Sequence, residues 1–210
     1  TNVEVIKETE TWMISFTRGD IKKPLHKIED YTGEKRSTGT RISFLPDPEI
    51  FPDTVFRYES LEHRLRELSF LNPGVSIRFI DERVDKEGKI REETFCSEHG
   101  LSDYVTYINR GKSEYSSPIS LSYTDEKTGI VCDIAMQYTD ATSEVLLAFG
   151  NNIVNPDGGT HVSGFKTSLT RTVNAYAKRN KLIKGLTPSG DDLREGLTSI
   201  VSVKLTGMIT

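Results

Sequence analysis

The sequence predicts an α/β (α+β) fold in two parts, residues 1–97 and 98–210. Alternating apolar residues predict strands, most clearly at 130–138, where every second residue is apolar. Leucines at three- and four-residue spacing between residues 58 and 71 predict an amphipathic helix. A second helical pattern covers 161–184 and carries only basic charges. Strands and helices mixed in this way are typical of layered domains.

The first part of the chain is expected to alternate strands with one helix. Asn72-Pro73-Gly74 follows the leucine pattern and predicts the end of that helix. The expected elements are a strand with Trp12, Ile14 and Phe16 on one face, a turn at 18–20, a strand at 40–44, a helix at 58–71 and a strand at 75–79.

The second part begins after a charged, turn-like segment at 85–88. Ser189 is followed three residues later by Asp192, which predicts a capping box at the start of a last helix. The other expected elements are a short helix at 101–108, hairpin arms at 119–123 and 130–138, a strand at 145–149, a loop at 151–160, the long helix from 161 and a strand at 200–203.

Composition indicates an ordered globular protein rather than a disordered one, since 35% of residues are hydrophobic and 28% are charged. No apolar run approaches the roughly 20 residues of a membrane span. Cys96 and Cys132 are too few and too far apart for a disulfide framework or a zinc site, so we expect packed thiols in the cytoplasm. Because Thr1 stands first without a basic and apolar leader, we expect an internal boundary there.

Charge is unevenly distributed along the chain. Residues 161–184 contain six lysines and arginines and no acidic residue, although the net charge of the whole chain is −4. The rest of the chain therefore carries −10. A basic helix in an acidic chain indicates either a solvated surface or contact with an anionic partner such as nucleic acid.

The residues alone show no catalytic constellation. The chain lacks a phosphate-binding loop, a strand-anchored dinucleotide motif and a zinc-protease motif, and its four histidines lack metal spacing. The junction from Asp157 to Thr160 contains two adjacent glycines before the basic helix. It predicts either an anion cradle or, as we favour, a tight turn with one positive φ and a cap from Thr160 or Asp157.

Several ordered blocks of sequence resemble one protein family. The blocks are Gly39–Asp47, His63–Asn72, Gly74–Ile77, Asn151–Ile153, Asp157–His161, Gly164-Phe165, Thr170–Thr172 and Gly190–Leu197. Together they are similar to the B subunits of bacterial type IIA DNA topoisomerases, DNA gyrase above all. The match runs from about residue 12 to residue 205.

The resemblance implies an enzyme that supercoils DNA by double-strand passage driven by ATP. It implies that residues 1–97 are the C-terminal part of a GHKL ATPase domain. Residues 98–210 would then be a transducer domain with a left-handed βαβ crossover. This segment would couple ATP binding and hydrolysis to DNA capture. The implied partners are DNA, the gyrase A subunit and a second B subunit, with no membrane.

Site residues follow from the same resemblance. Thr40 matches the threonine that holds adenine, and Ile42 matches a residue lining that pocket. The basic helix would bind duplex phosphates through Lys166, Arg171, Lys178 and Lys181. ATP and Mg²⁺ are implied for the full-length parent, with neither site complete in these 210 residues and no catalytic or metal-binding residue assigned.

The last five residues depart from the family pattern. The family continues after this strand into a loop whose lysine reaches the γ-phosphate, but Thr206–Thr210 do not match it. Two alternatives stay open. One is the corresponding subunit of topoisomerase IV, and the other is a stand-alone nucleic-acid-binding module. The ATPase-type helix at 63–72 argues against the second.

Overall fold

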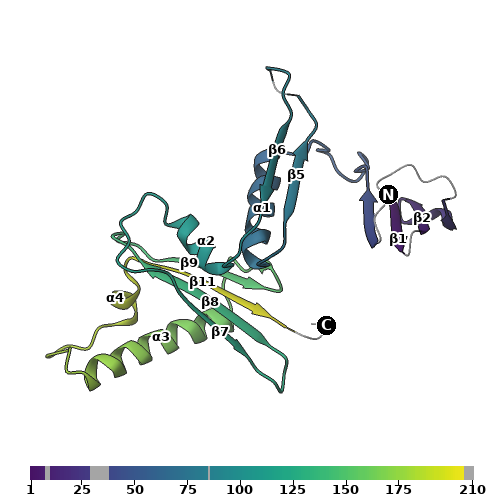
Figure 1. The fold of residues 1–210 in the computed structure, drawn as a ribbon. Coiled ribbons are helices and arrows are strands. Elements are labelled where there is room, and N and C mark those ends of the chain that lie inside the picture. Colours follow the sequence, from purple (N-terminus) through teal and green to yellow (C-terminus); the bar gives the residue numbers. More distant parts are fainter. Residues whose placement is uncertain (8–9, 29–37, 85, 206–210) are drawn as a thin grey trace. The chain divides into compact units, whose positions relative to one another are not determined.

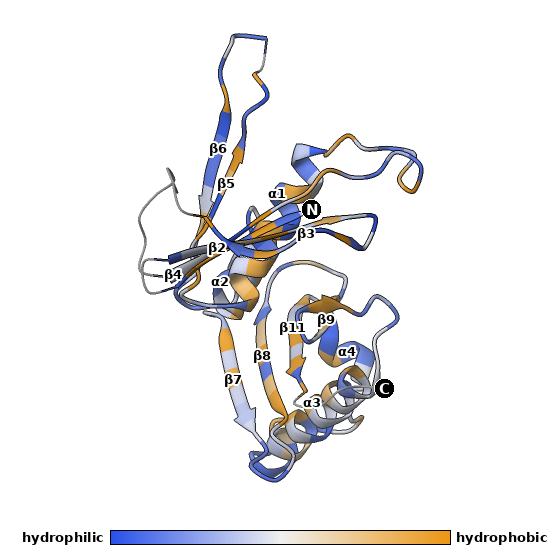
Figure 2. Cartoon of the chain, turned by 90° about the vertical axis from the view of Figure 1, so that its right-hand side faces the viewer, coloured by the Kyte–Doolittle hydropathy of each residue, from blue (hydrophilic) through white to orange (hydrophobic). Residues whose placement is uncertain are grey.

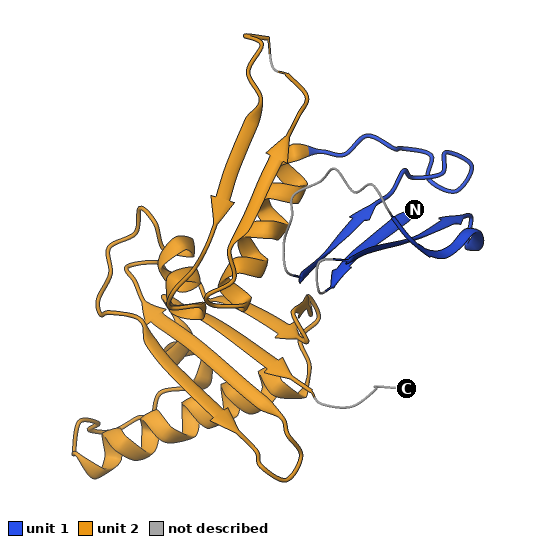
Figure 3. Ribbon diagram, turned by 45° about the vertical axis from the view of Figure 1, so that its right-hand side comes forward, with its two compact units in different colours: residues 1–57 blue, residues 58–210 orange. Residues whose placement is uncertain are grey.

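The computed structural model describes residues 1–7, 10–28, 38–84 and 86–205. It divides into two compact units, 1–57 and 58–210 (Figure 3). The predicted boundary between residues 97 and 98 falls inside the second unit and stays a prediction. Parts of the predicted 85–88 turn and all of Thr206–Thr210 lie outside the described residues.

The first unit is a four-stranded antiparallel sheet of order β3-β2-β1-β4. Its strands are β1 (Asn2–Lys7), β2 (Glu10–Thr17), β3 (Asp20–Lys27) and β4 (Thr38–Ser43). Arg18 and Gly19 connect β2 to β3 with φ of 52° and 91°. Two positive φ values in a two-residue loop fit the right-handed twist of a hairpin, so the predicted turn is confirmed.

The second unit opens with α1 (Tyr58–Leu71), β5 (Ile77–Asp81), β6 (Arg91–Phe95) and α2 (Leu101–Ile108). Both helices have the predicted bounds, while β5 begins two residues after Val75. Tyr58 stacks on Phe79 at 4.8 Å, and the Arg91 guanidinium lies 3.8 Å from the Tyr58 ring centroid. These contacts hold the β5–β6 hairpin beside the start of α1.

A five-stranded sheet of order β10-β9-β11-β8-β7 forms the rest of this unit (Figure 1). All its neighbours are antiparallel except β9 and β11, which the crossover through α3 and α4 makes parallel. The hand of this crossover stays a prediction. The elements are β7 (Ile119–Thr124), β8 (Val131–Tyr138), β9 (Val145–Gly150), β10 (Ile153–Val154), α3 (Thr160–Arg179), α4 (Gly190–Arg194) and β11 (Leu197–Lys204).

The core of the second unit lies on both faces of this sheet. On one face Val105 of α2 packs with Phe149 and Ile200. On the other face Phe165 of α3 packs with Leu197 and Val201. The central strand β11 is therefore buried on both sides along most of its length. Its hydrophobic residues are coloured orange in Figure 2. This layered arrangement confirms the predicted α+β class.

The two cysteines differ from the expectation of packed thiols. Both are free, and Cys96 is exposed, because it lies just beyond the end of β6. Cys132 is half-buried in β8, and burial raises the pKa of its thiol. None of the described helices has the length and apolar character needed to span a membrane.

Candidate functional site

Thr40 and Ile42 lie on β4, an edge strand of the first unit. Thr40 is opposite Val5, and Val5 is opposite Trp12 on the next strand. Residues directly opposite each other share a face, so the two predicted adenine contacts belong to an apolar face of the sheet. This face is open, since Ile42 is 63% exposed and Trp12 is 36% exposed.

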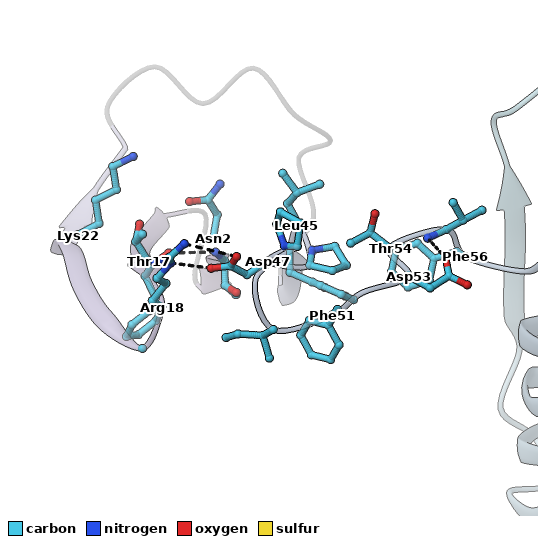
Figure 4. Close-up of a pocket in the computed structure, with 18 residues that line it drawn as sticks. Asn2, Thr17, Arg18, Lys22, Leu45, Asp47, Phe51, Asp53, Thr54 and Phe56 are labelled. Carbon is cyan, nitrogen blue, oxygen red and sulfur yellow. Dashed lines mark hydrogen bonds and ion pairs between the residues drawn. The ribbon is translucent and has the colours of Figure 1, made fainter.

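The first unit also has a cavity of about 920 Å³, which is lined by other residues than the predicted adenine contacts. It is bounded by the β2–β3 turn and by apolar side chains of residues 44–56 (Figure 4). Arg18 points into it toward Asp47, with ion pairs of 2.6 Å to Asp47 and 2.8 Å to Glu49. Neither Thr40 nor Ile42 lines this cavity, so its volume does not mark the predicted adenine site.

The basic helix α3 is shorter than the 161–184 pattern predicts. It ends at Arg179, and Asn180 is its C-cap. Lys181 follows with a φ of 56°, and the N–H groups of Lys181 and Leu182 donate to Lys178 O and Ala177 O. These two bonds form a Schellman motif, which ends a helix at a left-handed residue. Lys181 is thus on the helix end rather than on its face.

Arg171 and Lys178 form an outward basic row on α3. Both side chains are exposed, and no acidic partner is found for either one in the described part of the chain. Seven residues correspond to about two helical turns, so the two cations point the same way about 10 Å apart. Lys181 is exposed just beyond the end of the helix.

Lys166 lies in a different environment. At about 100° per residue, Lys166 lies only about 20° around the helix from the half-buried Val173 but about 140° from the exposed Arg171. Its amine is 3.1 Å from Glu144 Oε2, and the same oxygen accepts from Arg194 Nε at 3.2 Å. Lys166 is thus half-buried and already paired. The prediction that all four cations share one surface is wrong for this residue.

The start of α3 contains the predicted turn, while the anion cradle stays a prediction. Gly158 has a φ of 73°, as predicted for one of the two glycines, while Gly159 is extended. The predicted cap from Thr160 or Asp157 is wrong, because Gly159 is the N-cap and no described side chain accepts from the first N–H groups of the helix. A Cβ on Gly159 would lie 3.0 Å from the His161 ring.

The block Gly190–Leu197 is held by a capping box, which the sequence spacing predicts, and by an ion pair of Arg194, which it does not. The predicted capping box is present, with Ser189 Oγ accepting from Asp192 N at 3.2 Å and Asp192 Oδ2 accepting from Ser189 N at 2.8 Å. The Ser189 hydroxyl also donates to this carboxylate and lowers the pKa of Asp192. Arg194, whose side chain is 10% exposed, joins α4 to the Glu144–Lys166 pair.

The β9–β10 turn is a further polar centre. Asn151 and Asn152 have φ of 48° and 64°. Their polar groups bond to α1 on one side and to the end of β11 on the other. In the sequence the pair belongs to an expected loop and to a block that resembles the family, and neither observation predicts its hydrogen-bond partners.

Comparison with known proteins places this geometry in a family. The family model described as DNA gyrase B matches residues 100–207, just over half of the chain, including α3, α4 and the β9–β10 turn. The chain belongs to the DNA gyrase B family. The resemblance of the blocks between Asn151 and Leu197 is thereby confirmed.

Individual gyrase B proteins match almost the whole chain. The DNA gyrase B protein of Clostridium acetobutylicum is 45% identical over 97% of this chain, which spans 31% of that relative. The crystal structure of the 43K ATPase domain of Thermus thermophilus gyrase B, in complex with an aminocoumarin, has a TM-score of 0.80. The two sequences are 34% identical, and the matched region covers 98% of this chain and 55% of the Thermus thermophilus chain.

A topoisomerase IV ATP binding domain from Francisella tularensis, in complex with a small-molecule inhibitor, shares the same fold. Its TM-score is 0.75 at 24% sequence identity. The matched region covers 98% of this chain and 54% of the Francisella tularensis chain. The chain therefore spans about a third of the length of the curated gyrase B relative and about half of these solved domains.

Proposed function

We propose that this chain is part of an ATP-dependent type IIA DNA topoisomerase, the B subunit of a DNA gyrase. In that enzyme it would couple ATP binding and hydrolysis to DNA capture and gate movement. The observation that carries the proposal is the outward row of Arg171 and Lys178 on α3, inside the region matched by the gyrase B family. Lysine and arginine bind duplex phosphates without reading sequence.

The DNA surface we propose consists of Arg171, Lys178 and Lys181. All three are exposed, and none pairs with an acid among the described residues. Lys166, also predicted as a DNA contact, would have to leave Glu144 to reach a phosphate. A loosely held duplex fits such a surface, because a few exposed cations give weak, salt-sensitive binding.

For the nucleotide, the described residues fit only the base end. Thr40 offers a hydroxyl with no hydrogen-bond partner in the described part of the chain, and Ile42 offers an exposed apolar side chain on the same face. A hydroxyl can donate to or accept from the edge of adenine. No group of three or more His, Cys, Asp or Glu among the described residues is arranged for a metal. The residues that would hold the ATP phosphates and Mg²⁺ are therefore not assigned among the described ones.

The partners that follow from this function are duplex DNA, a gyrase A subunit and a second B subunit, in the cytoplasm. Topoisomerase IV is the alternative, because a topoisomerase IV domain shares the fold. The two enzymes differ in whether ATP drives negative supercoiling.

A plasmid assay tests the proposal and separates the alternatives. The full-length protein that carries this sequence is combined with its A-type partner, ATP and Mg²⁺, in separate reactions with relaxed and with supercoiled closed-circular plasmid. We expect ATP-dependent negative supercoiling. Relaxation or decatenation without supercoiling would instead identify a topoisomerase IV. No ATP-dependent change in topology would refute both.

A further inference from the structure

The second unit has a cavity of about 220 Å³ between one face of its five-stranded sheet and the adjoining ends of α1 and α2. We call it the α1–α2 cavity. None of the residues proposed for adenine or DNA lines it. Because a cavity of about 150 Å³ can hold one benzene molecule, this volume suits a ligand of about ten non-hydrogen atoms.

The helical wall of the α1–α2 cavity is apolar and closely packed. It includes Phe70 and Leu71 at the end of α1 and Leu101 at the start of α2. Phe70 stacks on Tyr104 at 4.8 Å. At Gly100, which has a φ of 58°, a Cβ would lie only 3.3 Å from Phe70 O. Glycine therefore allows the two helices to approach each other and to present one apolar surface to the cavity.

The sheet wall carries a buried hydroxyl without a partner. Ser202 is only 2% exposed, and it lies two residues after Ile200 on β11. Its side chain therefore points to the same face as that of Ile200, which packs against α2. It lines the cavity, and no group in the described part of the chain bonds to its hydroxyl. Since buried polar groups nearly always have a partner, this hydroxyl indicates that a polar group fills the cavity.

The charged groups that line the cavity favour an anion. Lys204 follows Ser202 on the same face of β11, is half-buried and forms no ion pair with any described acid. Asp133 is directly opposite Ser202, but its Oδ1 already accepts from Ser122 Oγ at 2.6 Å. The ring of His99 lines the helical side and can also donate. The groups without partners are thus donors, whereas the carboxylate already has one.

We propose that the α1–α2 cavity binds a small monocarboxylate whose apolar body is about the size of a benzene ring. The carboxylate accepts from the Lys204 amine and the Ser202 hydroxyl, and the apolar body packs on Phe70 and Leu101. An apolar cavity with a few convergent polar groups is the usual form of a small-molecule site, and charge-assisted hydrogen bonds are the strong ones. This ligand is independent of the proposed function, because the cavity shares no residue with the adenine or DNA surfaces.

Titration of the 210-residue chain with benzoate, followed by NMR amide shifts, tests the proposal. We expect saturable shifts at Leu101 and Ser202, with a Kd on the order of 1 mM for a ligand of this size. Lys204→Gln should weaken binding about tenfold, because a charge-assisted hydrogen bond is lost. Lys127→Gln on the exposed β7–β8 turn is the matched control and should leave the Kd unchanged. Equal Kd values for the chain and Lys204→Gln would overturn the proposal.

Further titrations test the charge of the ligand. Ser202→Ala should weaken benzoate binding a few-fold, whereas Asp133→Asn should bind benzoate at least as tightly as the chain, because it removes a nearby negative charge. Benzylammonium has the same ring and the opposite charge, and it should not bind. Tighter binding of benzylammonium than of benzoate would refute a carboxylate site. If benzoate gives no saturable shifts at all, water alone fills the cavity and the proposal fails.

Discussion

Two glycines decide how closely α4 and its flanks pack. A Cβ on Gly196 would lie 2.7 Å from both Thr139 O and Ala141 O, and its φ is 71°. A Cβ on Gly190 would lie 2.7 Å from Arg194 and 3.0 Å from Thr170 Oγ1. Gly196 meets backbone atoms, which cannot turn aside, whereas Gly190 meets the ends of side chains.

Gly196→Ala should therefore destabilise the second unit. The left-handed backbone costs a β-carbon about 1–2 kcal/mol, and displacing two carbonyls costs about 1–3 kcal/mol more. Thermal denaturation should show a midpoint lowered by roughly 2–4 °C per kcal/mol. Gly164→Ala on α3 is the control, because nothing lies within 4 Å of its Cβ. It should stabilise by up to about 1 kcal/mol, and equal effects at both positions would contradict this packing account.

Glu144 makes a second residue-scale prediction. Glu144→Gln removes the negative charge that the nearly buried Arg194 and half-buried Lys166 share. Hydrogen bonds to charged groups contribute about 1.5–3 kcal/mol, so urea unfolding should show a loss of that order. Glu126→Gln on the exposed β7–β8 turn should change stability by less than about 0.5 kcal/mol. A Glu144→Gln loss no larger than this control would show that the shared pair is not stabilising.

At the scale of elements, the capping box shows how local chemistry fixes a short helix. α4 has only five residues, and its start is held by Ser189 and Asp192. Ser189→Ala should cost about 1 kcal/mol of stability, measured by urea unfolding, because it removes the acceptor of the Asp192 N–H. Thr187→Ala, at an exposed position outside the box, should cost much less.

The same box predicts a pH dependence. The pKa of Asp192 is lowered in the folded state, first by the Ser189 hydroxyl and then by the Ser189 N–H. A lowered folded-state pKa adds stability that is present above the unfolded pKa of about 3.9 and is lost as pH falls through the folded value. The stability difference between the chain and Asp192→Asn, followed by thermal denaturation from about pH 7 to about pH 2, should shrink below about pH 4. A constant difference would contradict the assignment.

Elements with strong local signals were predictable from the sequence. α1, α2, the β7–β8 hairpin and the capping box follow from periodicity and from turn or cap residues. The end of α3 was not predictable, because Lys181 in the left-handed region occupies a position that usually belongs to glycine. The burial of Lys166 could have been foreseen from its helical angle beside Val173.

For the whole molecule, the sequence indicated two parts, but the compact units divide at residue 57. The reason is that α1 makes its hydrophobic contacts with α2, as where Phe70 stacks on Tyr104 at 4.8 Å. Such pairs join residues far apart in sequence, which periodicity does not predict. The Glu144–Arg194 pair and the Asn152 contacts were missed for the same reason. The family resemblance pointed to α3 as the basic segment. The side-chain geometry then separated Lys166, which pairs with Glu144, from the exposed Arg171 and Lys178.

The central claim is that the outward face of α3 binds duplex DNA phosphates. The most direct measurement is fluorescence anisotropy of a short labelled duplex across a salt series. Joint substitution of Arg171, Lys178 and Lys181 by Gln should reduce the log–log salt slope by roughly 2.7, or about 0.9 per lost contact. Lys166→Gln should change the slope by less than about 0.9, the value for one contact, because the Lys166 amine already pairs with Glu144. Equal slopes for the chain and the triple variant would contradict the account.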